Sequence, residues 1–255
     1  MLLAIDVGNT NTAYALFDGD KLAADWRTST HVDRTADEIG VEVIQLFGLR
    51  GRDVGDVTGV VIASVVPPLN AALIEACHRY LKHDPVVVGP GAKTGVKILY
   101  ENPKDVGSDR IANALAAYRK YGGPAVVIDF GTAVTYDAIS KDGDYLGGAI
   151  SPGIEISLDA LVAHTAMLRR VEPLAPDSVI GRNTVNAIQA GLIWGFVGQV
   201  EGMVKRMTDE LGGSAKVIAT GGQAGILDGL TAVIDAVDPL LTLEGLRLIY
   251  LQNRV

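Results

Sequence analysis

Cysteine is almost absent from this sequence, because Cys77 is the only one in 255 residues. A single cysteine excludes a disulfide framework and a multi-cysteine zinc site. The four histidines lack the spacing of metal ligands, and no Gly-x-Ser-x-Gly motif of a serine hydrolase occurs. No apolar run approaches the ~20 residues of a membrane-spanning helix, and the apolar start reaches Asp6 too soon for a signal peptide. We therefore expect a cytoplasmic protein without a membrane partner.

Positive charge is also scarce, with 22 Lys and Arg against 30 Asp and Glu and a net charge of −8. Nucleic acids and anionic membranes attract clustered positive charge, so we expect neither as the main partner. In contrast, 48% of the residues are hydrophobic, which is enough for a substantial core, and 30 glycines indicate tight turns or ligand-binding loops. The length suits one large domain or two small ones.

Strand and helix patterns alternate along the whole chain. Short apolar runs that end in turn residues predict strands at residues 2–6, 13–17, 21–26, 59–64, 85–88, 125–129, 132–139, 145–150 and 216–219. Amphipathic stretches predict helices at residues 35–46, 67–82, 108–121 and 184–211, with another after Pro152. This alternation is typical of the α/β class.

An internal repeat divides the chain. When Ile5–Leu16 is aligned with Ile128–Ile139, five of the twelve positions are identical, including an Asp-x-Gly turn after each apolar strand. The two aspartates, Asp6 and Asp129, lie 123 residues apart, about half the chain. Chance similarity between two apolar hairpins is the alternative. The repeat predicts two similar domains, at residues 1–122 and 123–255.

An Asp-x-Gly turn after a buried strand has a chemical use. Glycine lets the backbone approach a ligand closely, and successive N–H groups of a turn can bind an anion. The carboxylate beside them would hold a cation or position a water. Two such turns facing each other across a cleft would bind the phosphates and metal of one nucleotide, although an ordinary hairpin turn also favours Gly and Asn. The segment Gly89–Thr94 matches neither the P-loop nor the dinucleotide fingerprint.

Five short motifs occur in an order that resembles one known family. They are Asp6–Thr10 (DVGNT), Gly107–Arg110 (GSDR), Asp129–Ala133 (DFGTA), Gly147–Gly153 (GGAISPG) and Thr220–Gly222 (TGG). Together they resemble the bacterial type III pantothenate kinases, also called the Bvg accessory factor-like family. The resemblance spans essentially the whole chain. It implies the actin-like ATPase fold, in which a ribonuclease H-like domain is duplicated around a cleft.

This resemblance implies ATP-dependent phosphorylation of pantothenate, the first step of coenzyme A synthesis, by a homodimer that uses ATP with Mg²⁺. It assigns ATP binding to Asp6, Val7, Gly8, Asn9, Thr10, Asn11, Thr12, Ala13, Thr132, Gly221 and Gly222. Asp129 would ligate a monovalent cation, K⁺ or NH₄⁺, and Asp6 is a candidate for orienting hydrated magnesium. Small residues along the long helix, at Gly191, Gly195 and Gly198, would permit close approach of a partner helix or of the core.

The same resemblance places pantothenate at Tyr100, Gly107, Ser108, Asp109, Arg110 and Thr184. Asp109 would be the base that activates the acceptor hydroxyl, and Arg110 could bind the substrate carboxylate. We expect the helix N-terminus and Arg110 to lower the pKa of Asp109. Plainer roles exist, because Ser108 or Asp109, and likewise Thr184, could simply cap a helix. The family usually has alanine where this chain has Ser108.

Two other functions fit the same motifs. One is a kinase for another small metabolite, because the glycine turns would serve any nucleotide-dependent kinase. The other is a nucleotide-binding regulatory protein without kinase turnover, which the family's second name suggests. The presence of Asp109 favours an enzyme.

Overall fold

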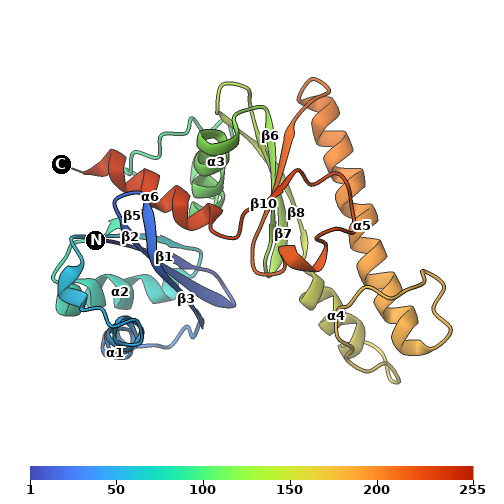
Figure 1. Ribbon diagram of the computed structural model, residues 1–255, viewed down its shortest axis with the longest axis horizontal. Coiled ribbons are helices and arrows are strands. Elements are labelled where there is room, and N and C mark those ends of the chain that lie inside the picture. The colour runs from blue at the N-terminus through green and yellow to red at the C-terminus, as the bar shows by residue number, and fades with distance from the viewer. Residues whose placement is uncertain (255) are drawn as a thin grey trace. The chain divides into compact units, whose positions relative to one another are not determined.

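The structure, a computed structural model, describes residues 1–254 and divides into two compact units (Figure 1). The first unit comprises Met1–Lys97, Glu101–Ala116 and the segment from Leu241 onward. The second comprises Ile98–Tyr100 and Ala117–Leu240. Within residues 1–254, no helix combines the length and apolar character needed to cross a bilayer.

A five-stranded sheet with the order β3-β2-β1-β4-β5 forms the centre of the first unit. Its strands are β1 (Leu2–Val7), β2 (Asn11–Asp18), β3 (Lys21–Ser29), β4 (Gly59–Ser64) and β5 (Val86–Val87). Strands β1, β2 and β3 pair antiparallel, whereas β4 runs parallel to β1 and β5 runs parallel to β4. The carboxyl ends of β1 and β4 therefore lie side by side.

Helices cover both faces of this sheet. Alternate apolar residues of β1, Leu3 and Ile5, pack towards α1 (Ala36–Gly48) and α2 (Pro67–Ala76). The other face carries α6 (Leu241–Asn253), which packs on β1, β2 and β4. The C-terminal helix thus belongs to the first unit, unlike in the expected division at residue 122, because its apolar face is buried on this sheet.

The second unit repeats the same strand order. Its strands are β6 (Ala125–Phe130), β7 (Ala133–Ile139), β8 (Tyr145–Pro152), β9 (Lys216–Thr220) and β10 (Ala236–Val237), arranged as β10-β9-β6-β7-β8. Again three strands are antiparallel, and the next two continue in parallel. Helices α4 (Ile154–Ala163) and α5 (Thr184–Glu210) pack against this sheet. The expected α/β class and the duplication are confirmed.

The hairpin registers correct the sequence alignment of the repeat. Tyr14 pairs with Ile5, and Tyr136 pairs with Ile128, so the two buried tyrosines are structural equivalents. The second turn is one residue shorter than the first, because Val7 pairs with Thr12 whereas Phe130 pairs with Val134. The identities Thr12/Thr135 and Ala15/Ala138, which follow the turns, therefore do not mark equivalent positions. The identities Ile5/Ile128 and Asp6/Asp129, which precede the turns, do mark equivalent positions.

Local signals explain most helix boundaries. Helix α1 begins after Thr35, whose side chain and Glu38 form the expected capping box. Helix α3 spans Ser108–Tyr121, as expected from the sequence.

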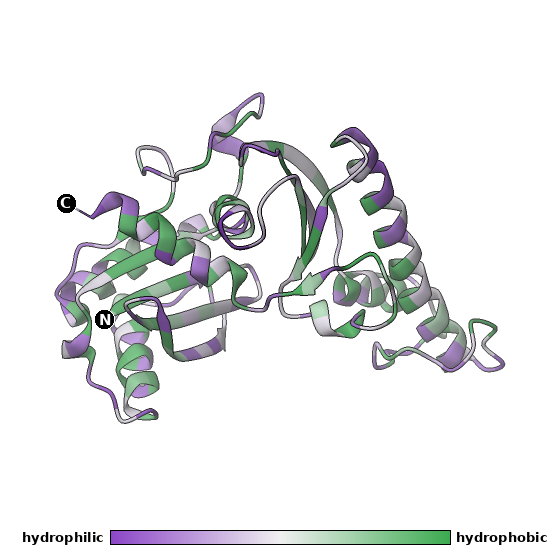
Figure 2. Ribbon diagram, turned by 45° about the horizontal axis from the view of Figure 1, so that its top comes forward, coloured by the Kyte–Doolittle hydropathy of each residue, from purple (hydrophilic) through white to green (hydrophobic). Residues whose placement is uncertain are grey.

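Shorter helical turns occur at η1 (Val54–Asp56), η3 (Pro103–Asp105) and η4 (Ala224–Ile226). In Figure 2 the central strands are mainly hydrophobic and the turns mainly hydrophilic.

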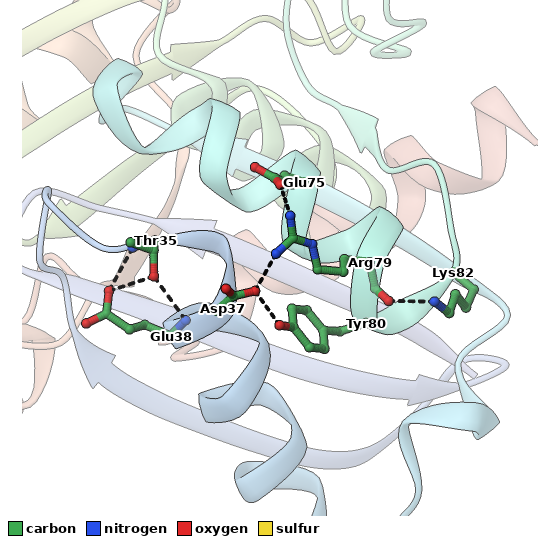
Figure 3. A network of polar contacts seen from close by, with 7 residues as sticks. All are labelled: Thr35, Asp37, Glu38, Glu75, Arg79, Tyr80 and Lys82. Carbon is green, nitrogen blue, oxygen red and sulfur yellow. Dashed lines mark hydrogen bonds and ion pairs between the residues drawn. The ribbon is translucent and has the colours of Figure 1, made fainter.

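Helix α2 ends in a π-helical turn, η2 (Cys77–Leu81), and Lys82 follows with a positive φ of 60°. This turn presents Arg79 and Tyr80 to α1, where both donate hydrogen bonds to Asp37 (Figure 3). Arg79 also pairs with Glu75 in α2. The network joins the two helices that cover one face of the first sheet.

Candidate active site

The first glycine turn is closed by its own backbone. The Gly8 N–H donates to the Asn11 carbonyl at 3.0 Å. Thr30, the residue after β3, makes two hydrogen bonds to this turn. Its N–H donates to the Thr10 carbonyl at 2.9 Å, and its hydroxyl is hydrogen-bonded to the Thr12 hydroxyl at 2.9 Å. Thr12 is buried, whereas Asn9 to Asn11 are exposed. The turn is therefore braced on one side and open to a ligand on the other.

The start of α3 lies at the same edge of the first sheet as this turn. Val7, which precedes the turn, pairs with Ser64 at the end of β4, and the Val65 N–H donates to the Val7 carbonyl at 3.0 Å. The Ser64 N–H then donates to Ser108 Oγ at 3.1 Å. The structure thus brings the expected ATP loop, Asp6–Ala13, to the same sheet edge as the expected pantothenate residues Gly107–Arg110.

This contact accounts for the serine at position 108. Ser108 is buried, and its hydroxyl accepts a hydrogen bond from a backbone group at the end of a neighbouring strand. An alanine would fit the space but would leave that N–H without this acceptor. The departure from the family pattern is therefore compatible with the site.

Asp109 differs from expectation in the direction of its pKa shift. Its Oδ1 accepts the Arg110 N–H at 2.8 Å, and a Cβ at Gly107 would overlap the same oxygen. Burial raises the pKa of Asp109 above its ordinary value, and the opposing effect of Arg110 is smaller. The expected lowering of this pKa is wrong, because removal of the carboxylate from water outweighs the helix terminus and the neighbouring cation. A raised pKa makes Asp109 a stronger base.

The second glycine turn is enclosed by the end of β8. The Gly131 N–H donates to the Ala133 carbonyl, and the Gly153 N–H donates to the Thr132 carbonyl, both at 3.0 Å. A side chain at Gly153 would overlap the Gly131 carbonyl. The last glycine of the GGAISPG motif is therefore needed for close packing on the turn that contains Thr132.

The end of β9 lies directly against Asp129. Asp129 pairs with Thr220, and Gly221 follows with a φ of +92°. A Cβ at Gly221 would overlap Asp129 Oδ1 and lie 2.6 Å from both the N and the O of Phe130. The Gln223 N–H also donates to the Phe130 carbonyl at 3.0 Å. The structure thus brings Asp129 and Thr132 together with the Thr220–Gly222 motif.

Asp129 is the candidate cation ligand of this site. Within residues 1–254, no three His, Cys, Asp or Glu side chains gather in a way that could hold a metal. Asp129 supplies one carboxylate, and the Phe130 carbonyl lies on the same side of Gly221. Carboxylate and carbonyl oxygens are ligands of hard cations, so Asp129 could take part in holding one.

Tyr100 lies in a short segment that joins the second unit. It is 38% exposed, and its ring contacts the buried Tyr145 at the start of β8. Thr184 is exposed and is the first residue of α5, whereas Asn183 is the helix cap, its side chain accepting the Asn186 N–H at 2.9 Å. The alternative of Thr184 as the cap is therefore wrong.

Thr184 lines a hollow of about 720 Å³ between α4, the segment before α5 and the start of α5.

Two residues that contact the expected site, Ser64 and Thr30, were not predicted from the sequence. Ser64 could have been found, because the carboxyl ends of parallel neighbours share one edge of a sheet. Thr30 carries no motif, and only the observed pairing of β2 with β3 brings it to the turn.

A family model for type III pantothenate kinase matches residues 2–206. The chain belongs to the type III pantothenate kinase family. It is 54% identical over 253 residues to the type III pantothenate kinase of Moorella thermoacetica, covering 99% of this chain and 100% of that protein. The corresponding kinase of Myxococcus xanthus is 53% identical over 253 residues, covering 99% of each. The expected family is confirmed.

Solved structures of more distant proteins share the fold of this chain. A conserved protein from Campylobacter jejuni that is described as a member of the Baf family matches with a TM-score of 0.64 at 21% identity, covering 98% of each chain. The activator of 2-hydroxyisocaproyl-CoA dehydratase from Clostridium difficile, with bound ADPNP, matches with a TM-score of 0.53 at 12% identity, covering 99% of this chain and 94% of that one. At these identities the likeness concerns the fold alone, and it agrees with the expected duplicated actin-like ATPase fold.

Proposed function

We propose that this protein transfers the γ-phosphoryl group of ATP to the primary hydroxyl of pantothenate, forming 4′-phosphopantothenate at the start of coenzyme A biosynthesis. Membership of the type III pantothenate kinase family supports this activity. The observation that carries it in the structure is the position of Asp109 at the sheet edge that also holds the first glycine turn. A candidate base and a candidate phosphate loop are thereby fixed to the same strand ends.

Each loop has a defined role in the proposed reaction. The Gly8 N–H and the Thr12 hydroxyl hold the first turn together, so the exposed residues Asn9 to Asn11 would supply the contacts to phosphate oxygens of ATP. Thr132, Gly221 and Gly222 would also contact ATP. Mg²⁺ bound with ATP would neutralise phosphate charge, with Asp6 orienting its water shell. Thr30 would keep the first loop in shape through its hydrogen bonds to Thr10 and Thr12.

Asp109 would receive the proton of the acceptor hydroxyl. The hydroxyl oxygen attacks the γ-phosphorus, the bond from that phosphorus to the β–γ bridging oxygen breaks, ADP leaves, and the proton goes to Asp109 Oδ2. Phosphoryl transfer passes through a loose transition state, so orientation of the hydroxyl matters more than base strength. The raised pKa of Asp109 adds to its capacity as a proton acceptor. Arg110 beside it would bind the pantothenate carboxylate, and Tyr100, Gly107, Ser108 and Thr184 would complete the substrate contacts.

We further propose that K⁺ or NH₄⁺ binds at Asp129, as the family resemblance implies, because its carboxylate and the Phe130 carbonyl both lie beside Gly221 at the strand ends. Such a cation would complement the phosphate charge near Thr132. Replacing potassium by sodium is the direct check, since the two ions differ in radius but not in charge. An unchanged rate in sodium would argue against a selective site at Asp129.

We also propose a homodimer formed through the outer side of α4 and α5. Apolar side chains in this region are exposed, among them Met167 at 89%, Val179 at 64% and Ile180 at 79%. In α5, a Cβ on Gly191, Gly195 or Gly198 would meet no atom within 4 Å, so this helix face is open. Large exposed apolar patches mark interaction surfaces. Sedimentation of the wild type and of Ile180→Glu should show a dimer and a shift towards monomer.

The deciding experiment is a coupled assay with pantothenate, ATP, Mg²⁺ and K⁺, run beside calorimetric titration with ATP. Turnover of pantothenate supports the proposed kinase. ATP binding without turnover of any acceptor would instead support the regulatory protein. Turnover of a different small alcohol with no reaction of pantothenate would identify another metabolite kinase.

A further inference from the structure

One residue, Tyr145, holds the segment that carries Tyr100 to the second sheet. The Leu99 N–H donates to the Tyr145 carbonyl at 2.8 Å, and Ile98 forms an isolated bridge with the same residue. The ring centroids of Tyr100 and Tyr145 lie 6.3 Å apart with an interplanar angle of 54°. This is a tilted aromatic contact at a favourable separation. Tyr145 thus supports the Tyr100 segment through both its backbone and its ring.

A buried carboxylate fixes the Tyr145 side chain in turn. The Tyr145 hydroxyl donates to Asp137 Oδ1 at 2.9 Å, and both residues are 0% exposed. The Thr135 hydroxyl donates to Asp137 Oδ2 at 3.3 Å. A buried carboxyl group is costly unless hydrogen bonds satisfy it. Asp137 therefore holds the Tyr145 ring in one orientation.

Gly147 provides the remaining space for Tyr100. Its φ is +123°, a conformation that side chains rarely adopt. A Cβ at this position would lie 3.4 Å from Cδ2 and Cε2 of the Tyr100 ring. Gly147, the first glycine of the GGAISPG motif, therefore lies next to the Tyr100 ring without a side chain between them.

We infer that Asp137 and Tyr145 are positioning residues that set the orientation of Tyr100 and thereby the affinity for the acceptor substrate. This inference rests on the proposed function, in which Tyr100 contacts pantothenate. Both residues act through Tyr100. A rigid support of this kind orders the ring before the substrate arrives, which removes part of the entropic cost of binding. Neither residue belongs to the motifs that suggested the function.

The test is Tyr145→Phe, which keeps the ring and removes only the hydroxyl. We expect the KM for pantothenate to rise about tenfold, while the KM for ATP stays within twofold of wild type, roughly the effect of one lost bond to a carboxylate. Asp137→Asn keeps an oxygen acceptor and should give a smaller rise. The matched control is Tyr121→Phe, which removes another tyrosine–aspartate hydrogen bond of the second unit, to Asp238 at 3.0 Å. The control should leave both KM values unchanged.

Three results would overturn the inference: an unchanged pantothenate KM in folded Tyr145→Phe, an equal rise in both KM values, or the same change in Tyr121→Phe. If Tyr145→Phe fails to fold, Asp137→Asn carries the test, because it weakens the same hydrogen bond to the Tyr145 hydroxyl while keeping an oxygen acceptor, and an unchanged pantothenate KM there is equally decisive. Absence of pantothenate turnover in the wild type refutes the proposed function and this inference together. Wild-type turnover with unaffected variants refutes this inference alone.

Discussion

Gly221 lies so close to Asp129 that a β-carbon on the glycine would overlap the Oδ1 atom of the aspartate. The two residues come from neighbouring parallel strands, β9 and β6, and meet at their carboxyl ends. The backbone of the expected ATP motif Thr220–Gly222 is therefore in direct contact with Asp129, the expected cation ligand. A change at either residue should affect both ligands.

Gly221→Ala is the first consequence. The substitution combines a φ of +92° with overlap onto Asp129 and Phe130, so we expect a loss of about 1–3 kcal/mol in stability. We also expect the KM for ATP and the K⁺ requirement to rise together. Gly225→Ala is the control, because no atom lies within 4 Å of its added Cβ. Equal kinetics for the two variants would contradict the arrangement.

Asp109→Asn should separate catalysis from binding. Removal of the proton acceptor is expected to lower kcat by about 10²-fold or more, with ATP affinity nearly unchanged by calorimetry. In the wild type, kcat/KM should fall as pH decreases through the raised pKa of Asp109, at a higher pH than an ordinary aspartate would give. Turnover of Asp109→Asn within a few-fold of wild type would remove Asp109 from the mechanism.

The same substitution should stabilise the protein at neutral pH. Since folding raises the pKa of Asp109, the stability that this group contributes is present below its unfolded pKa of about 3.9 and is lost as pH rises through the folded pKa. Asparagine carries no charge to desolvate. Melting curves should therefore show a higher Tm for Asp109→Asn at pH 7 and a smaller difference near pH 4. A lower Tm at pH 7 would contradict the burial argument.

The Asp37 network of Figure 3 should have the opposite pH dependence. Hydrogen bonds from Tyr80 and Arg79 lower the pKa of Asp37, so its contribution is present above the unfolded pKa and is lost as pH falls through the lower folded value. Asp37→Asn should lower Tm at pH 7, and the difference from wild type should vanish in acid. Asp20→Asn, in the exposed turn between β2 and β3, is the control.

Gly40→Ala tests how closely α1 packs against η2, the turn that follows α2. Alanine favours a helix over glycine by about 1 kcal/mol, but its methyl group would overlap the Tyr80 ring. We expect a net loss of about 1–3 kcal/mol, measured by denaturant unfolding. Gly48→Ala, at the end of the same helix, meets no atom within 4 Å and should be neutral or stabilising. The free energy of unfolding should fall in Gly40→Ala and stay equal or rise in Gly48→Ala, and this difference decides the test.

Features set by neighbouring residues could be predicted from the sequence, whereas those set by burial could not. The capping box at Thr35 and the bounds of α3 follow from a few adjacent side chains. The pKa of Asp109 depends on how much protein surrounds it, which no local pattern encodes. The Ser64–Ser108 contact joins residues 44 positions apart, and its geometry exists only after β4 and α3 have packed.

The repeat shows the same limit. The sequence alignment matched equivalent strand residues before each turn. After the turn, the pairing of Tyr14 with Ile5 and of Tyr136 with Ile128 shows that the alignment is wrong by one residue. A turn can lose a residue without changing the strands around it, so identity counts across a turn do not show which residues correspond. The buried tyrosines reveal the true correspondence.

The return of α6 to the first sheet has a consequence for synthesis. One face of β1, β2 and β4 is covered by a helix at residues 241–253, which the ribosome makes long after those strands. The nascent first unit must therefore wait, with that apolar face uncovered, until nearly the whole of the second has been translated. Chaperones that shield exposed sheet surfaces during elongation should accordingly bind the growing chain most strongly before Leu241 emerges.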